Sequence, residues 1–321
     1  MKTEMTMETA AQQNIEFTPK KKKMNKNTWQ LYSLAAIPII LVFIFCYLPM
    51  FGIVIAFKNY KYNLGIWGSE WVGFDNFKFF THSTDFIRLV RNTLGMNALF
   101  IIFGTMAAVL VAIFLYDLKS RNATKVYQTV LITPHFMSWV IVAYIAYAFL
   151  NPQYGLINSI VEAFGGTARD WYSEPRHWPF ILTVCYIWKH VGMDCVVYYA
   201  ALMGMDNSLV EAAKIDGANK KDIIIHIIIP TLLPLITILT ILKIGNIFRA
   251  DFGLFYQVPR NIGKLYATTD VIDTYVFRAM RVIGDMGMSS AVGFLQSIVG
   301  MILVIITNKV SKMIDPETGL F

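Results

Sequence analysis

The chain of 321 residues is 56% hydrophobic and only 15% charged, with a mean hydropathy of +0.50. This composition excludes an ordinary soluble domain and indicates a protein that crosses a membrane several times. The formal net charge of +7 would suit nucleic-acid binding in a soluble chain, but here the basic run Lys20–Lys23 directly precedes the first apolar stretch. Basic residues in that position predict a cytoplasmic N-terminus.

The start of the chain is polar and shows no hydrophobic periodicity, so residues 1–28 are expected to form a largely disordered cytoplasmic tail. Residues 29–321 are expected to form a membrane domain. Its apolar stretches are about 20 residues or longer, enough to cross a hydrocarbon core of about 30 Å. The sequence therefore predicts an all-α membrane protein with about six spans and both termini in the cytoplasm. The spans are expected at 31–56, 94–116, 127–150, 178–203, 227–248 and 288–308.

Two long segments are then expected outside the cell. Residues 58–91 are rich in aromatic side chains, which are typical of an interfacial belt and are also compatible with a docking surface for another protein. Residues 251–285 are too many for a simple turn, so this segment is a candidate for part of an external gate.

The segment 206–230 carries several charges between the fourth and fifth spans, so it must lie in water at the membrane surface. Asp206, Asn207 and Ser208 are all residue types that cap helices, and Ser208 has capping-box spacing with Glu211, so a short helix is expected to begin here. Gly217 then predicts a turn that needs a left-handed backbone or a close contact. A second short helix is expected to begin at Asn219, with Asp222 three residues later, and Pro230 marks the return to the bilayer.

The same segment resembles a known motif. Glu211-Ala212-Ala213 is followed after three residues by Gly217, and after nine more by Ile227, one residue, Ile229 and Pro230. This spacing is similar to the EAA motif of permease subunits of ATP-binding-cassette importers, with Ile229 where the family more often has Leu. The alternative is a solvated amphipathic connector without a partner. The resemblance implies that ATPase subunits contact a coupling segment, residues 206–230, through Glu211, Ala212, Ala213, Asp216 and Gly217.

Further stretches narrow the resemblance. Residues 71–77 and 187–192 look like the maltose-type carbohydrate branch of these permeases, and residues 134–140, 270–278 and 291–297 are similar to LplB-like polysaccharide permeases of Gram-positive bacteria. The likeness runs from about residue 30 to the C-terminus. It implies a type I importer permease fold in a bacterial plasma membrane, and import of an oligosaccharide or polysaccharide fragment by alternating access. It also implies a heterodimer with a second permease, two cytoplasmic ATPase subunits and an extracellular solute-binding lipoprotein.

Other functions leave weaker signals in the sequence. There is no G-x-x-x-x-G-K-[ST] run, so ATP and Mg²⁺ are expected to be used by the partner ATPase, and no cofactor, metal site or catalytic residue is expected in this chain. His190 and Asp194 are the only close His and Asp pair in a span, and no convincing nucleophile accompanies them. The alternatives are an importer permease for an amino acid or a polyamine, or else a membrane enzyme or channel.

Polar residues within the spans form a candidate solute path. Tyr186, His190, Asp194 and Tyr198 follow one another at four-residue steps and share one face of the fourth helix. Ionisable groups at this depth are costly unless they face a cavity or each other, and aromatic rings with polar groups suit sugars. Alternatively, His190 and Asp194 satisfy each other, and Lys189 snorkels outward or pairs with a partner helix. Lys243 and Asn246 are also candidates for bonds between helices. The full set of candidate lining residues is Tyr186, Trp188, His190, Asp194, Tyr198, Tyr199 and Asn246.

Overall fold

The computed structural model describes residues 26–78 and 85–314 of the chain. The chain divides into two units, residues 1–51 and 52–321, and each is described by itself. Helix α1 begins at Lys26, so the last three residues of the expected tail are helical, and the rest of that tail lies outside the described residues.

The first unit is a single apolar helix. Helix α1 (Lys26–Val42) continues into the π-helical turn η1 (Phe43–Tyr47) and the 3-10 helix η2 (Leu48–Phe57), whose last residues belong to the second unit. Every described side chain from Trp29 to Phe51 is exposed. An apolar surface of this length suits lipid, and residues 32–57 confirm the first predicted span.

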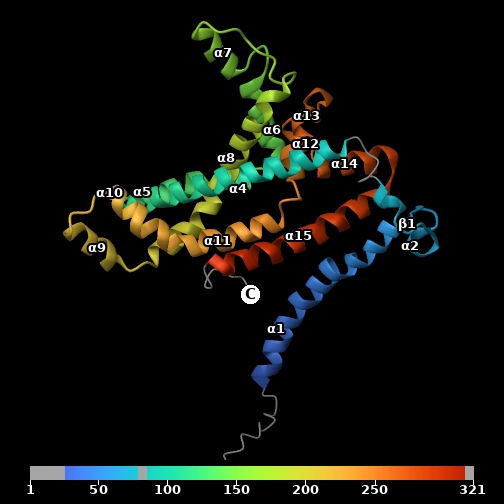
Figure 1. Ribbon diagram of the computed structural model, residues 1–321, viewed down its shortest axis with the longest axis horizontal. Coiled ribbons are helices and arrows are strands. Elements are labelled where there is room, and N and C mark those ends of the chain that lie inside the picture. The colour runs from blue at the N-terminus through green and yellow to red at the C-terminus, as the bar shows by residue number, and fades with distance from the viewer. Residues whose placement is uncertain (1–25, 79–84, 315–321) are drawn as a thin grey trace, which may run out of the picture. The chain divides into compact units, whose positions relative to one another are not determined.

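Long helices of the second unit confirm further predicted spans (Figure 1). Helix α8 has the predicted bounds, whereas α4 starts eight residues earlier than predicted and α11 is preceded by a short helical run from Lys220. These helices are α4 (Phe86–Asp117), α8 (Trp178–Met203), α11 (Ile229–Gly245) and α15 (Met286–Ile314).

The third predicted span is not one continuous helix, and the sequence-based expectation of a helix over 127–150 is wrong. Helix α5 (Arg121–Ile132) leads into the 3-10 turn η4 (Thr133–Phe136), and α6 (Trp139–Leu150) then starts at an angle of 101° to the first part. Pro134 has no amide hydrogen to continue the helix. The Ser138 hydroxyl accepts a hydrogen bond from the Ile141 amide and begins α6 as its N-cap.

Short elements fill the connections. The strands β1 (Lys58–Asn59) and β2 (Glu70–Trp71) pair antiparallel around α2 (Gly65–Gly68), a minor departure from the expected all-α fold. The segment between β2 and α4 contains η3 (Asp75–Lys78). The connection from α6 to α8 contains α7 (Leu156–Ala163) and η5 (Pro175–His177). The connection from α11 to α15 contains α12 (Phe252–Gln257), η7 (Gly263–Leu265), α13 (Tyr266–Thr269), α14 (Ile272–Arg278) and η8 (Ala279–Ile283).

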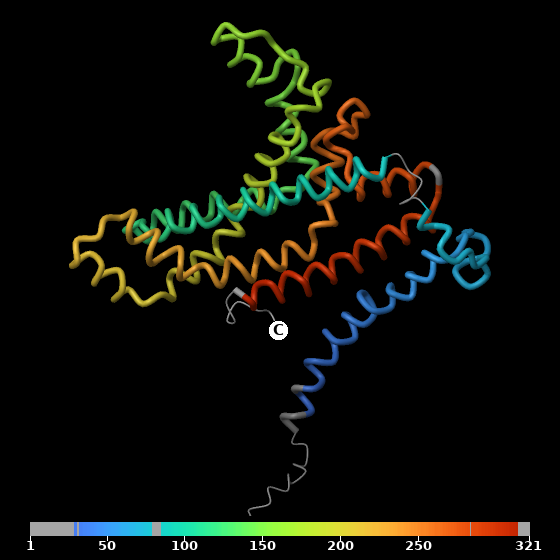
Figure 2. The backbone as a smooth tube through the Cα atoms, viewed as in Figure 1, coloured from blue at the N-terminus to red at the C-terminus, as the bar shows by residue number. Residues whose placement is uncertain are grey.

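The coupling segment folds into α9 (Asn207–Ile215), α10 (Lys220–Ile223) and the π-helical turn η6 (Ile224–Ile228). It lies at the end of the second unit where α4 also ends (Figure 2). The aromatic segment after β1 leaves Trp67, Trp71 and Phe74 more than half exposed, as an interfacial belt requires.

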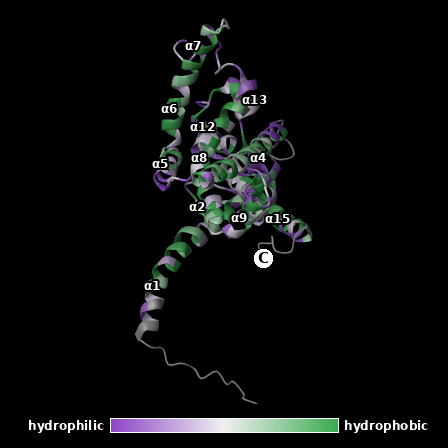
Figure 3. Ribbon diagram, turned by 90° about the vertical axis from the view of Figure 1, so that its left-hand side faces the viewer, coloured by the Kyte–Doolittle hydropathy of each residue, from purple (hydrophilic) through white to green (hydrophobic). Residues whose placement is uncertain are grey.

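Two apolar clusters lie along the α4 and α8 pair. Phe100 of α4 and Trp178 of α8 join α6 and α12 in one cluster. Ala108 of α4 and Leu202 of α8 join Val210 of α9, as well as α10 and α11, in the other. Hydrophobic colouring also runs along much of α1, whose described side chains are exposed (Figure 3). Apolar side chains that face outward are expected where the solvent is lipid.

Gly192 allows α8 to pack against the end of α5. A β-carbon at this position would lie 1.9 Å from the Leu131 carbonyl oxygen, which is backbone and cannot rotate away. We therefore expect Gly192→Ala to separate the two helices and to lower the yield of folded protein severalfold. Gly204→Ala is the matched control, because its β-carbon would meet nothing closer than 3.6 Å. Monodisperse Gly192→Ala protein with the melting temperature of Gly204→Ala would contradict this prediction.

Candidate functional site

The first candidate site is the coupling segment, whose first helix begins where the sequence predicts. Of the three candidate caps, Asp206 is the N-cap of α9 and accepts a hydrogen bond from the Ser208 amide at 2.9 Å. Ser208 and Glu211 therefore do not form the capping box that their spacing suggests. The Ser208 amide lowers the pKa of the Asp206 carboxyl below its usual value, as expected for a carboxylate at a helix N-terminus.

Gly217 makes the turn that the sequence predicts. Its φ is +83°, and hydrogen bonds from the Gly217 and Ala218 amides to α9 carbonyls close the helix. A β-carbon at Gly217 would meet nothing within 4 Å, so the requirement is the left-handed backbone rather than a close contact. The second expected cap is confirmed, because Asn219 and Asp222 form a capping box at the start of α10.

The coupling segment presents an exposed surface on a fixed base. Glu211, Ala212, Asp216 and Gly217 are exposed, while Ala213 is half-buried. The same surface exposes 86% of Ile215, a large apolar side chain that the described residues leave uncovered. An exposed apolar residue among charges is typical of a protein contact.

The base of this surface is held by contacts with α4. Val210 and Ile223 are buried in the cluster that α4, α8 and α11 share. Lys220 Nζ lies 2.8 Å from the carboxylate of Asp117. Tyr116 donates a hydrogen bond to Asn207 at 2.8 Å. The segment is thus attached to the end of a span by apolar and polar contacts together.

The second candidate site is the polar face of α8. Tyr186 stacks on Phe100 at a ring distance of 4.2 Å, and its ring centre lies 4.6 Å from that of His190. His190 Nε2 is buried and has no hydrogen-bond partner in the described part of the chain. His135 and Trp139, from the broken third span, face the same imidazole at 5.6 and 6.0 Å. Tyr186 and His190 lie together as their four-residue spacing predicts, and the broken span supplies two further side chains that the sequence does not predict.

Asp194 does not pair with His190. Its carboxylate lies 2.8 Å from Lys243 Nζ of α11, and both side chains are more than a quarter exposed. This contact makes Lys243 a link between helices, which was one of the two sequence-based interpretations. Tyr198 is only 1% exposed and lies in the apolar cluster between α4 and α8. The polar face of α8 is therefore partly exposed at Asp194 and fully buried at Tyr198.

The remaining candidate residues are spread over the surface of α8 and the end of α11. Trp188 is 41% exposed and Tyr199 is half-buried beside the apolar cluster around Cys195. Asn246 is exposed and donates a hydrogen bond to the Leu242 carbonyl of its own helix. Their roles in a solute path stay predictions. Among the described residues, no group of His, Cys, Asp and Glu side chains is arranged to hold a metal ion.

Lys189 does not snorkel outward but bonds to a neighbouring helical segment. It is 6% exposed, and its ammonium donates to the carbonyls of Pro134, His135 and Met137 at the break between α5 and α6. Trp139 lies under the ammonium at 5.2 Å. A helix that ends inside the membrane leaves carbonyl groups without hydrogen-bond donors, and the Lys189 ammonium supplies these donors. The sequence contained one signal of the break, a proline four residues before a serine that can start a helix.

Trp139 connects the break to the segment 251–285. Its indole nitrogen donates to Asp251 Oδ2 at 2.8 Å, and Asp251 is itself the N-cap of α12. A β-carbon on Gly253 would overlap the Trp139 ring, so α12 packs closely on this side chain. The polar face of α8, the broken span and α12 therefore form one connected site.

The chain is similar to components of known transport systems. The family described as binding-protein-dependent transport system inner membrane component matches residues 100–317. Protein LplB of Bacillus subtilis is 36% identical over 298 residues, which cover 93% of this chain and 92% of that protein. The polygalacturonan/rhamnogalacturonan transport system permease protein YteP of the same organism is 36% identical over 275 residues, which cover 85% of each chain.

A solved structure has the same fold. A chain in the crystal structure of a bacterial alginate ABC transporter, in complex with an alginate pentasaccharide-bound periplasmic protein, superposes with a TM-score of 0.80. The sequence identity is 32%, and the match covers 90% of this chain and 96% of that chain. The similarity therefore includes nearly all of the structure described above.

Lys189 provides a test of how the broken span is stabilised. We expect Lys189→Met to lower the free energy of unfolding by about 3 kcal/mol, because buried carbonyl groups lose their donor. Lys220→Met is the matched control, since it removes an ion pair whose side chains are 80% and 63% exposed and that contributes little. Thermal unfolding of the detergent-solubilised protein measures both. Equal melting temperatures for the two variants would refute the role of Lys189.

Proposed function

Because the chain belongs to the family of inner membrane components of binding-protein-dependent transport systems, we propose that it imports an oligosaccharide or polysaccharide fragment into the cytoplasm. It is a multi-pass subunit of an ATP-binding-cassette transporter, a transport component rather than an enzyme. The observation that carries the proposed solute is the match over 90% of this chain to a transporter solved with an alginate-bound periplasmic protein. The permease YteP, named for pectin-type polysaccharides, supports the same class of solute.

The site on α8 has the chemistry that a sugar needs. The aromatic rings of Tyr186 and Trp139 lie beside His190, and Asp194 is partly open to hydroxyl groups, a combination of side chains that suits a sugar. The buried nitrogen atoms His190 Nε2 and His135 Nδ1 have no partner in the described part of the chain. Buried polar atoms normally have partners, so these two nitrogens suit a water molecule or a passing hydroxyl group.

The proposed mechanism is alternating access driven by partner subunits. Two cytoplasmic ATPase subunits bind ATP and Mg²⁺, and one of them docks on the exposed surface of α9 and Gly217. A second, related permease forms a heterodimer with this chain, and an extracellular lipoprotein delivers the solute. Both termini lie in the cytoplasm in this arrangement, in the plasma membrane of a Gram-positive bacterium. The attachment of the coupling segment to α4 supports this proposal, because Val210 and Ile223 are buried in the cluster that includes α4, and a push on α9 then moves a whole span.

Charge reversal on the coupling surface tests the docking. We expect Glu211→Lys to insert and fold normally, because the side chain is exposed, but to reduce ATPase association and solute uptake at least tenfold. Glu162→Lys on α7 is the control, since it reverses an equally exposed charge outside the coupling segment. Co-purification of the ATPase and uptake in proteoliposomes are measured together. Wild-type values for Glu211→Lys in both assays would reject the docking role.

Gly217 tests the geometry of the same surface. Valine in a left-handed backbone is strained by about 1–2 kcal/mol, whereas asparagine adopts this conformation readily. We expect Gly217→Val to reduce uptake severalfold and Gly217→Asn to retain most of it. Uptake by reconstituted transporters distinguishes them, and undiminished transport by Gly217→Val would show that the turn is not required.

A further inference from the structure

A pocket lies between α6 and α12, apart from the face of α8 described above. It has a volume of about 360 Å³, which is within the usual range of small-ligand pockets. Aromatic rings and side-chain amides form much of its lining, together with one cation. The residues concerned are Tyr144 and Tyr147 of α6, Tyr256 and Gln257 of α12, and Arg260 and Asn261 just after it.

The turn that carries the cation has an uncommon backbone. Arg260 and Asn261 have φ angles of +57° and +50°, and they are the only non-glycine residues with positive φ in the described part of the chain. Such a conformation is costly in a residue like arginine, and it persists only where the surroundings hold it. Backbone outliers of this kind are concentrated at ligand sites.

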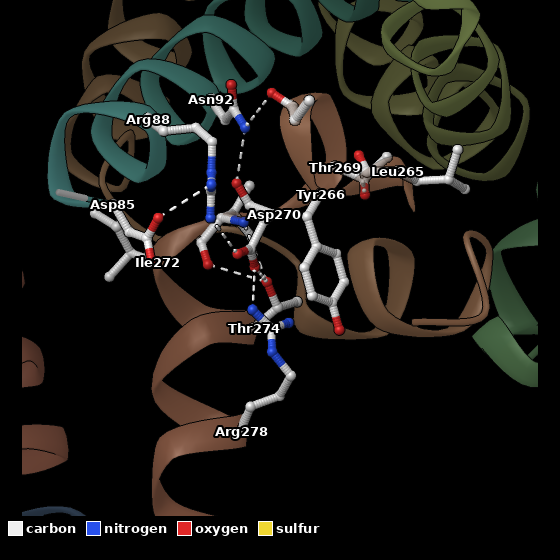
Figure 4. A network of polar contacts seen from close by, with 12 residues as sticks. Asp85, Arg88, Asn92, Leu265, Tyr266, Thr269, Asp270, Ile272, Thr274 and Arg278 are labelled. Atoms are coloured by element: carbon white, nitrogen blue, oxygen red, sulfur yellow. Dashed lines mark hydrogen bonds and ion pairs between the residues drawn. The ribbon is translucent and has the colours of Figure 1, made fainter. Parts of the chain in front are cut away.

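The surroundings hold this turn through a polar network, and Figure 4 shows the part of it around Asp270. Tyr266 donates to Asn261 Oδ1 at 2.8 Å, and Arg278 approaches the same oxygen at 3.4 Å. Arg278 is fixed in turn by Asp270, which is 1% exposed and lies 2.6 Å away. Arg88 and Asn92 of α4 bind the same aspartate through its side chain and its carbonyl group. The conformation of the Arg260 turn is therefore fixed by contacts that reach α4.

The guanidinium of Arg260 is accessible from the pocket. The Arg260 side chain is exposed, and its guanidinium lies over the Tyr147 ring at 4.3 Å. No carboxylate lines the pocket, and the guanidinium makes no hydrogen bond or ion pair within the described residues. Stacking on Tyr147 positions the guanidinium without using its N–H groups. A planar cation held in this way matches a carboxylate, which it binds through two parallel hydrogen bonds.

We propose that this pocket is a subsite for an acidic sugar unit, with the carboxylate of a uronate on Arg260 and the sugar ring against the tyrosines. Tyr144 is 68% exposed and offers a ring face to the sugar, while Gln257 offers an amide to its hydroxyl groups. This inference rests on the proposed function as a carbohydrate permease. It adds that the permease prefers negatively charged sugars. It predicts that the transporter distinguishes acidic from neutral oligosaccharides within its membrane subunits.

The test uses trigalacturonate and the same trisaccharide after reduction of its carboxyl groups to alcohols. Binding of both probes to the purified, complete transporter without the solute-binding protein is measured by titration calorimetry. We expect the wild type to prefer the acidic probe. We expect Arg260→Gln to reduce that preference about tenfold, as for the loss of one charge-assisted contact. Arg260→Lys should keep part of the preference, because it keeps the charge and loses the planar fork.

Arg176→Gln is the matched control, since Arg176 is an exposed arginine that does not line the pocket. Its preference should equal that of the wild type. An unchanged preference in well-folded Arg260→Gln, or an equal loss in Arg176→Gln, would overturn the subsite. If only the neutral probe binds to the wild type, the subsite is wrong and the proposed carbohydrate transport stands. If neither probe binds and no oligosaccharide is taken up, the proposed function itself fails.

Discussion

The packing of α4 against α8 is the interaction on which the rest of the second unit depends. Both large apolar clusters extend from this pair, one toward α6 and α12 and the other toward α9, α10 and α11. At one end of α4, Tyr116 and Asp117 hold the coupling segment. At the other end, Arg88 and Asn92 hold Asp270 in the segment 251–285. One helix of 32 residues, about 48 Å long at 1.5 Å per residue, thus connects the two functional surfaces.

The membrane imposes a second constraint, the pairing of every backbone polar group at depth. Continuous helices meet it within themselves, but the broken third span does not. Lys189 provides the missing donors and is buried as a result. The break is useful because it turns His135 and Trp139 toward His190, where a continuous helix would keep them on its own surface. Irregular backbone in a membrane is expected where it lines a functional cavity.

The sequence predicts the spans and the coupling segment well because their signals are local. Long apolar runs set the helices, and the left-handed turn at Gly217 and the cap at Asn219 follow from neighbouring residues. The sequence does not predict contacts that depend on how helices rotate about their axes. The pair of Asp194 with Lys243 and the bonds of Lys189 are of this kind. The sequence predicts where α9 begins but not which residue caps it, because Asp206 and Ser208 cap equally well and local chemistry does not choose between them.

The central claim is that the coupling segment and the opposite end of α4, near Phe86, move as one body. Spin labels at Ile215 and Ile87, which are 86% and 77% exposed, test it directly once the exposed Cys46 is replaced by serine. Distances are measured by double electron–electron resonance in the reconstituted transporter, with and without ATP. The account predicts that the distance changes by no more than about 2 Å, the size of a small helix shift. A change of about 5 Å or more, the length of one helical turn, would contradict it.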